Sequence, residues 1–231
     1  MEDNIVPIAM PGIHEKFYPY LKKVLNTYEK PEILEIGSGH GAFTKRLWMD
    51  GYHVTATDIF PEYFYFDKMV CEKVDIRQPM PFSDGSFNII IAVEVMEHVH
   101  DHEIFFSECS RILKKGGRLI FSTPNILSLK SRIRFLLSGF FYSFPPIIHS
   151  NNDGLQHLAS LTVDQYNNLG IRNGLTLIDI SIDKIQRTSR VYLILFYPLI
   201  FLYNKLKRLD NMHNTSKLLL GRILFINFIR D

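Results

Sequence analysis

The segment EILEIGSGHG at residues 32–41 decides how this chain is expected to fold. A short apolar run leads into three glycines at alternate positions, and apolar residues at helical spacing follow from Phe43 to Trp48. A glycine-rich turn between a strand and a helix lets the backbone approach a bound nucleotide, because glycine has no Cβ and the helix N-terminus offers unpaired N–H groups. The segment therefore predicts a strand, a nucleotide-binding turn and a helix.

Strand and helix patterns alternate from this segment to about residue 122, which is typical of a doubly wound α/β sheet. The run at 87–93 is apolar except for Asn88, as expected of a strand buried on both faces of a parallel sheet. We predict one α/β domain that spans residues 1–231. Its strands are expected at 31–36, 53–57, 71–74, 87–93, 118–122, 175–182 and 221–229.

Acidic residues stand at the ends of three predicted strands. Glu35 is in the first strand, Asp58 follows the second, and Asp75 follows the third. Asp58 lies 21 residues after Gly37, at the position from which a carboxylate accepts hydrogen bonds from both hydroxyls of a ribose. The three acids are expected to converge on the crevice where such sheets bind ligands.

The glycine segment also matches the GxGxxA pattern of enzymes that bind nicotinamide dinucleotides. Glu35 argues against this alternative, because a carboxylate directly ahead of the glycines would repel a pyrophosphate. The same carboxylate suits a ligand that carries an ammonium group and no phosphate. S-adenosyl-L-methionine is such a ligand, and we expect it as the cofactor.

Composition indicates a single globular chain. Of the 231 residues, 46% are hydrophobic and 22% are charged, which is enough to bury one core and excludes a disordered tail. Two cysteines without CxxC spacing exclude a disulfide framework and argue against a structural zinc site. The N-terminus shows no basic and apolar leader, so we expect a cytoplasmic protein.

The net charge of +2 hides an uneven distribution. Residues 1–185 carry 18 Lys and Arg against 22 Asp and Glu, whereas residues 186–231 carry 8 against 2. The basic part surrounds the most apolar run, Val191–Tyr203, which is shorter than the ~20 residues of a membrane span. We expect an apolar helix at about 190–209 that touches a membrane surface through residues 190–208, or else packs in the core or an oligomer interface.

At this point the sequence resembles the class I S-adenosylmethionine-dependent methyltransferases. The likeness covers most of residues 11–182 and rests on four stretches: ILEIGSGHGAFTKRL, TATDIFPE, VDIRQPMPFSDGSFNIIIAVEVMEHV and RILKKGGRLIFSTPN. It implies a Rossmann-like, seven-stranded and mainly parallel sheet whose last strand, at 221–229, is antiparallel.

The resemblance also implies which residues hold the cofactor. Glu35 and the glycines would hold the methionine portion, Asp58 the ribose, and Asp75 the adenine. The residues expected at the cofactor are Glu35, Gly37, Ser38, Gly39, Gly41, Asp58, Ile59, Asp75, Ile76 and Glu94.

The acceptor side is expected to include Glu94, Glu97 and His98, which their spacing would place on one face of a helical turn. Related quinone-pathway and small-RNA O-methyltransferases hold Mg²⁺ with such a cluster. We favour a reading without metal, in which Glu94 serves the cofactor. His98, Glu97 and His157 are then the expected catalytic residues, with His98 as general base or acceptor contact. His100 and His102 are expected to be solvated.

Residues 126–160 are expected to form a lid over the acceptor, or a capping helix with a solvated basic edge. The sequence resembles most the methyltransferases of surface polysaccharide and lipid-linked sugar pathways, which implies O-methylation of a glycan or a lipid-linked small molecule. The alternatives are a metal-assisted quinone or RNA O-methyltransferase, and a membrane-peripheral nucleotide-binding protein without turnover. The acidic balance of residues 1–185 argues against nucleic acid as partner.

Overall fold

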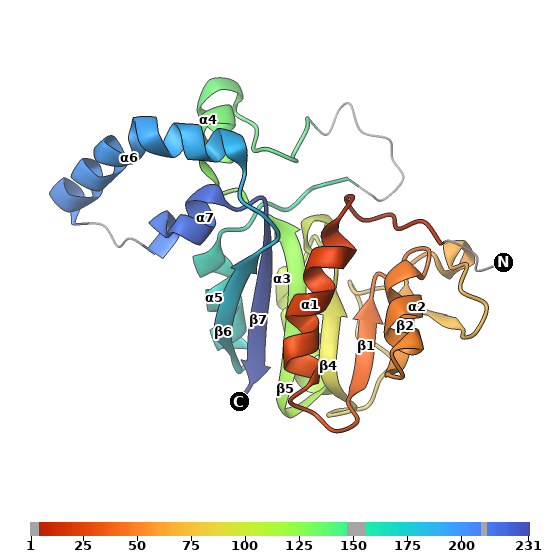
Figure 1. Cartoon of the computed structure of the whole chain (residues 1–231). Helices are drawn as coiled ribbons and strands as arrows, with labels where there is room; N and C mark the ends of the chain where they lie inside the picture. Colours follow the sequence, from red (N-terminus) through yellow and green to blue (C-terminus); the bar gives the residue numbers. More distant parts are fainter. Residues whose placement is uncertain (1–4, 147–155, 209–211) are drawn as a thin grey trace.

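A computed structural model describes residues 5–146, 156–208 and 212–231 of the chain. One twisted sheet forms the centre, and helices cover both of its faces (Figure 1). The strands are β1 (Glu32–Ile36), β2 (His53–Asp58), β3 (Cys71–Lys73), β4 (Phe87–Ala92), β5 (Leu113–Pro124), β6 (Leu175–Ile182) and β7 (Ile223–Arg230). The helices are α1 (Ile13–Leu25), α2 (Ala42–Met49), α3 (His102–Ile112), α4 (Leu129–Ser138), α5 (Val163–Arg172), α6 (Arg187–Lys207) and α7 (Ser216–Leu220), with short 3₁₀ turns η1 (Pro61–Tyr63), η2 (Met96–His98) and η4 (Met212–Asn214).

The sheet has seven strands in the order β3-β2-β1-β4-β5-β7-β6. Neighbours from β3 to β5 pair in parallel, and β7 pairs antiparallel with both β5 and β6. This confirms the predicted fold class. The chain moves outward from β1 to β3 and then returns to β4, so the strand order reverses between β1 and β4, where doubly wound sheets bind ligands.

The central strand β4 shows how the core is divided. Ile89 and Ile91 join the cluster of buried side chains under α1 and α2, whereas Ile90 joins the cluster under α3 and α5. Both faces of β4 are therefore buried, as its nearly continuous apolar run predicts.

Beyond β5, the predicted strands and the apolar helix differ from the structure only at their ends, whereas the short helix α7 was not predicted. The apolar helix expected at 190–209 is α6, which runs from Arg187 to Lys207. The described part of the expected lid contains α4, and residues 147–155 lie outside the described part of the chain. Within the described ranges, none of the helices combines the length and the hydrophobicity that a transmembrane crossing requires.

Asn125 fastens the end of β5 to the C-terminal part of the chain. Its buried amide nitrogen donates to the carbonyl oxygens of Leu218 and Gly221, at 2.7 and 2.9 Å. Its amide oxygen accepts from the backbone nitrogen of Leu127 at 3.0 Å. One side chain thus satisfies three backbone groups where α4 leaves the sheet.

Replacing this side chain by an apolar one of similar size tests that role. We expect Asn125→Leu to lower the free energy of unfolding by about 2–4 kcal/mol, because buried backbone groups lose their partners. Asn168→Leu, at an exposed position of α5, is the control and should change stability by less than about 0.5 kcal/mol. Equal denaturation midpoints in urea for the two variants would contradict this assignment.

Candidate functional site

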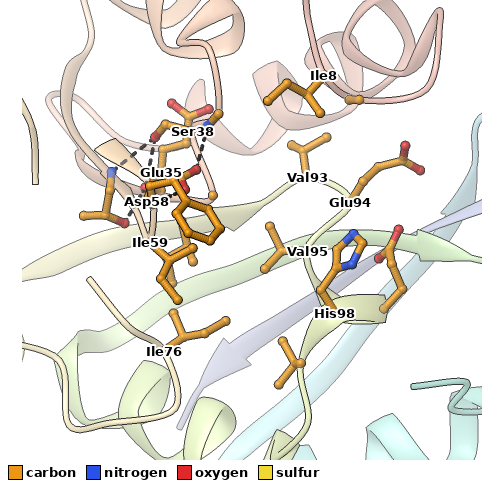
Figure 2. A pocket seen from close by; sticks show the side chains of 18 of the residues that line it. Ile8, Glu35, Ser38, Asp58, Ile59, Ile76, Val93, Glu94, Val95 and His98 are labelled. Atoms are coloured by element: carbon orange, nitrogen blue, oxygen red, sulfur yellow. Dashed lines mark hydrogen bonds between the residues drawn. The ribbon is translucent and has the colours of Figure 1, made fainter. Parts of the chain in front are cut away.

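A cavity of about 490 Å³ lies at the carboxyl edge of the sheet and gathers the predicted site residues (Figure 2). Figure 2 shows Glu35, Ser38 and Asp58 on one side of it, and Glu94 and His98 on the other, with Val93 and Val95 between them. The predicted residues that line the cavity are Glu35, Gly37, Ser38, Gly39, Asp58, Ile59, Asp75, Ile76, Glu94, Glu97, His98 and His157. Gly41 is the one predicted residue that does not line it.

The turn after β1 is held open by hydrogen bonds to β2. The backbone nitrogens of Gly37 and Ser38 both donate to the carbonyl oxygen of Thr57, at 2.9 and 3.0 Å. Gly37 has a φ of 72°, and a Cβ added there would come within 2.5 Å of a Val95 methyl group. Only glycine fits this position, so the backbone itself forms the wall of the cavity.

Gly41 supports the same turn from outside the cavity. It has a φ of 85° and immediately precedes α2, and an added Cβ would lie 2.7 Å from the ring of Phe64. The structure thus gives Gly41 a role in the shape of the turn, and its contact with a cofactor stays a prediction.

Asp58 is positioned by two backbone amides. The nitrogen of Gly39 donates to Oδ2 at 2.8 Å, and the nitrogen of Phe60 donates to Oδ1 at 2.9 Å. A carboxylate has about four acceptor sites, so both oxygens keep a lone pair for a ligand. The side chain is thus fixed and still able to accept two further hydrogen bonds.

Glu35 is buried beneath the turn. The hydroxyl of Thr44 donates to Oε2 at 2.5 Å. Burial raises the pKa of Glu35 to about 8, the nearby charge of Asp58 acts in the same direction, and hydrogen bonds from Thr44 and Ser38 oppose it. At neutral pH this carboxyl group therefore holds a proton in the ligand-free protein.

Asp75 forms an ion pair at the far end of the cavity. Arg77 donates to both of its oxygens, at 2.8 Å from Nε and 2.7 Å from the guanidinium terminus. These hydrogen bonds lower the pKa of Asp75. Among the described lining residues, Arg77 is the only lysine or arginine, so the cavity offers no unpaired cation to a pyrophosphate.

Glu94 lies on the opposite side, directly after β4. Its φ of 55° is left-handed, and the backbone nitrogen of Met10 donates to Oε2 at 2.8 Å. Its Oε1 atom is buried without a hydrogen-bond partner among the described residues, and burial raises its pKa. The prediction that Glu94, Glu97 and His98 share one helical face is wrong for Glu94, because the left-handed residue interrupts the helical geometry before η2.

Glu97, His98 and His157 form a compact group. One ligand atom from each lies within 4.8 Å of the other two, and the two imidazole rings are 4.9 Å apart. Both carboxyl oxygens of Glu97 are buried without a hydrogen-bond partner among the described residues, and burial holds its pKa well above the usual range. One carboxylate with two imidazoles suits zinc or another transition metal better than Mg²⁺.

The hydrogen bond of His98 fixes which ring nitrogen is basic. Its Nδ1 atom lies 2.9 Å from the carbonyl oxygen of Gln156. A carbonyl only accepts, so Nδ1 carries a proton, and Nε2 of the neutral ring is the atom that can take one.

Residues outside the predicted set also line the cavity. Residues 7–9 line it, although no motif marks this segment. His14 also lines it, packs against the ring of Phe43, and is kept neutral because burial lowers its pKa to about 4.

His102 was expected to be solvated, and this prediction is wrong. The side chain is buried, and its Nε2 atom lies 3.1 Å from the carbonyl oxygen of Met96. Phe105 and Phe106, at i+3 and i+4, place His102 on the buried face of α3, and this spacing was a signal in the sequence.

A family model and several curated proteins match part of this chain in sequence. Residues 34–121 match the family model described as a methyltransferase domain. A demethylmenaquinone methyltransferase of Tropheryma whipplei is 32% identical over 111 residues, which cover 44% of this chain and 46% of that protein. A ubiquinone biosynthesis O-methyltransferase of Xylella fastidiosa is 32% identical over 107 residues, covering 40% and 42%. The chain thus matches less than half the length of these curated relatives.

Solved structures match over nearly the whole chain. An S-adenosylmethionine-dependent methyltransferase from Archaeoglobus fulgidus aligns with a TM-score of 0.64 at 15% identity, covering 94% of both chains. One from Mesorhizobium loti aligns with a TM-score of 0.59 at 16% identity, covering 95% of this chain and 99% of that one. Residues 34–121 therefore match a methyltransferase domain in sequence, and the chain as a whole has the Rossmann-like fold of the class I S-adenosylmethionine-dependent methyltransferases.

Proposed function

We propose that the protein is an S-adenosylmethionine-dependent O-methyltransferase that acts on a glycan or a lipid-linked small molecule. The observation that carries this proposal is the cavity between β1 and β4, in which carboxyl groups surround a glycine turn. Arg77, the one lysine or arginine among the described lining residues, is already paired with Asp75. S-adenosylmethionine, when bound, supplies a methyl group that its sulfonium centre has already activated. The protein then has to bind and orient the acceptor and remove a proton from its hydroxyl group.

The half of the cavity around β1 and β2 fits this cofactor. Asp58 has lone pairs left for two ribose hydroxyls. Glu35 can lose its proton and form an ion pair with an ammonium group. Ile59 and Ile76 provide apolar walls for an adenine ring next to Asp75. The carboxylates disfavour the pyrophosphate of the nicotinamide dinucleotides, the rival ligands.

The half around η2 fits proton removal from a hydroxyl. We assign Nε2 of His98 as the base, because its Nδ1–H already donates to Gln156 and stabilises the imidazolium that forms. Burial raises the pKa of Glu97 and so favours the protonated carboxyl group, which can donate a hydrogen bond to the acceptor beside His157. These three side chains remain the proposed catalytic group.

A prenylated quinone is supported as acceptor about as well as a lipid-linked sugar. The two relatives above are named for menaquinone and ubiquinone pathways. The aromatic and basic side chains of α4 suit either acceptor, because both combine a polar ring with a lipid tail. The group of Glu97, His98 and His157 would let a metal-assisted route operate on the quinone.

Cofactor binding is tested by titration calorimetry with S-adenosylhomocysteine. We expect the wild type to bind S-adenosylhomocysteine and not to bind NAD. In Asp58→Ala the affinity for S-adenosylhomocysteine should fall by about 10- to 100-fold, because two hydrogen bonds to a charged group disappear. Asp67→Asn, at an exposed position outside the cavity, is the control and should bind like the wild type. Preferential binding of NAD would overturn the proposal.

The raised pKa of Glu35 predicts that cofactor binding releases a proton. An ammonium group next to the carboxyl lowers its pKa, so the bound protein is ionised where the free protein, with a pKa of about 8, is not. Below pH 8 the affinity for S-adenosylhomocysteine should therefore rise with pH, by up to about tenfold per unit.

The proton count comes from the dependence of the binding enthalpy on the ionisation enthalpy of the buffer. The wild type should release more protons than the titration of the ligand itself accounts for. Glu35→Gln should lack this additional proton release. Without ligand, the same raised pKa makes the wild type lose stability between about pH 5 and 7.5, by up to about 1.4 kcal/mol per unit, because only the folded carboxyl keeps its proton. Glu35→Gln should lack this slope, and identical pH profiles for both proteins would contradict the assignment.

The role of His98 is tested with radiolabelled cofactor and two acceptor panels, hydroxylated prenyl quinones and polyprenyl-linked sugars. We expect His98→Gln to lower kcat by about 10²- to 10⁴-fold while the affinity for S-adenosylhomocysteine stays unchanged. The favoured reading without metal predicts that activity survives exhaustive chelation, and that Glu97→Ala binds the cofactor normally. Loss of activity on chelation, restored by Zn²⁺ or Mn²⁺, would establish the metal-assisted alternative instead.

A further inference from the structure

Helix α6 exposes most of its apolar side chains. Its buried residues are Ser189 and Asn204, which are both polar. Ile194 is 79% exposed, and Leu206 is 72% exposed. The large apolar side chains exposed on α6 are Val191, Ile194, Leu195, Tyr197, Leu199, Phe201, Leu202, Tyr203 and Leu206. A helix that is apolar on nearly all sides is normally covered by another apolar phase.

Only one side of α6 is packed against the protein. It contacts α4 and α7, and Leu193 and Ile200 pack onto a small cluster that contains Leu129 and Leu219. Figure 1 shows α6 beside α4, with its C-terminal half extending away from the sheet. The alternative that this helix packs in the core is therefore wrong for its outward side.

Helix α4 continues the same apolar surface. Leu136 and Leu137 near its C-terminal end are 77% and 80% exposed, and Phe135 and Phe140 are exposed beside them. We call the exposed apolar residues of α4 and α6, together with Phe140, the α4–α6 face. It is far larger than the isolated exposed apolar residues that are ordinary on a protein surface.

Cations border this face, and acids are absent from it. Residues 126–146 and 187–208 contain eight lysines and arginines and no aspartate or glutamate. Lys130 and Arg134 lie over the ring of Tyr142, with Lys130 Nζ at 3.6 Å from its centre. Along α6, Arg187, Ile194 and Lys205 are spaced by 7 and 11 residues, so they lie on one stripe that has an apolar middle and cationic ends.

We propose that the α4–α6 face docks onto an anionic lipid bilayer, with α6 lying in the plane of the interface. The apolar middle enters the acyl boundary, and the cations at both ends of α6 contact anionic headgroups. A second copy of the chain is a poorer occupant, because a symmetric contact would bring cations against cations with no acid in either segment. An anionic bilayer complements both the apolar and the charged parts of the face.

The docking surface lies near the same end of the strands as the cavity. Helix α4 follows the carboxyl end of β5 (Figure 1). Residues that follow the carboxyl ends of β1, β2 and β4 line the cavity. A docked protein would therefore receive an acceptor whose lipid tail stays in the bilayer. This consequence rests on the proposed methyl transfer, whereas the docking itself does not.

Flotation with lipid vesicles tests the proposal on the full chain. We expect the wild type to float with vesicles of equal parts phosphatidylglycerol and phosphatidylcholine, to stay below with pure phosphatidylcholine, and to dissociate as NaCl rises from ~0.05 to ~0.5 M. Ile194→Glu with Leu202→Glu should abolish flotation. Neutralising Arg190, Lys205, Lys207 and Arg208 to Gln should weaken vesicle partitioning at least about tenfold, since each cation contributes about fivefold at low salt.

Matched controls separate this effect from charge and folding in general. The first control, Val70→Glu, introduces an acid at an apolar position outside the face that is 81% exposed. The second control removes four exposed cations elsewhere by replacing Lys16, Lys23, Lys30 and Lys115 with Gln. Both controls should float like the wild type, and all variants should bind S-adenosylhomocysteine as the wild type does. A wild type that stays below with anionic vesicles overturns the proposal. If it also forms a dimer that Ile194→Glu disrupts, the occupant is a second copy. Vesicle binding without any methyl transfer would leave the docking intact and refute the proposed function alone.

Discussion

The carbonyl oxygen of Thr57 accepts hydrogen bonds from two successive amides, those of Gly37 and Ser38, and the cavity depends on this contact. It ties the turn after β1 to the end of β2 and keeps the next amide, that of Gly39, within 2.8 Å of Asp58. The hydroxyl of Ser38 completes the tie by accepting from the nitrogen of Thr57. Each of these contacts thus has a backbone group on at least one side, and the two bonds to the carbonyl of Thr57 join backbone to backbone.

The carboxyl groups around the cavity differ because their donors differ. Asp58 accepts from two backbone N–H groups, and Asp75 accepts from Arg77, whose hydrogen bonds lower the pKa of Asp75. Glu35 is buried with the hydroxyl of Thr44 at Oε2, and Glu97 is buried without a hydrogen-bond partner among the described residues; burial raises the pKa of both carboxyl groups. The site therefore combines carboxylates that are tied by N–H donors with buried carboxyl groups whose pKa is raised.

How far the sequence predicts this site depends on whether the signal is local. The glycine turn, the acid after β2 and the apolar strand β4 follow from short patterns, because backbone conformation and two-sided burial select residue types directly. The left-handed conformation of Glu94 has no such signal, since it arises where Met10, distant in sequence, donates to the side chain. The burial of His102 was readable from Phe105 and Phe106, and its prediction failed because the residue was considered without its helical neighbours.

The sequence match to the methyltransferase family model ends within β5, whereas the likeness of fold to solved structures continues over nearly the whole chain. The family match stops at residue 121, and Asn125 then fastens the start of the lid to residues near β7. Helices α4 and α6 beyond this junction bury few side chains, so their outer residues are weakly constrained by the stability of the sheet. Under the proposed function, these outer residues would meet the acceptor and its environment, while the glycine turn and the acids would hold the cofactor. The local signals of the fold therefore lie mainly in the first half of the chain, whereas the proposed contact with the acceptor depends on residues beyond β5.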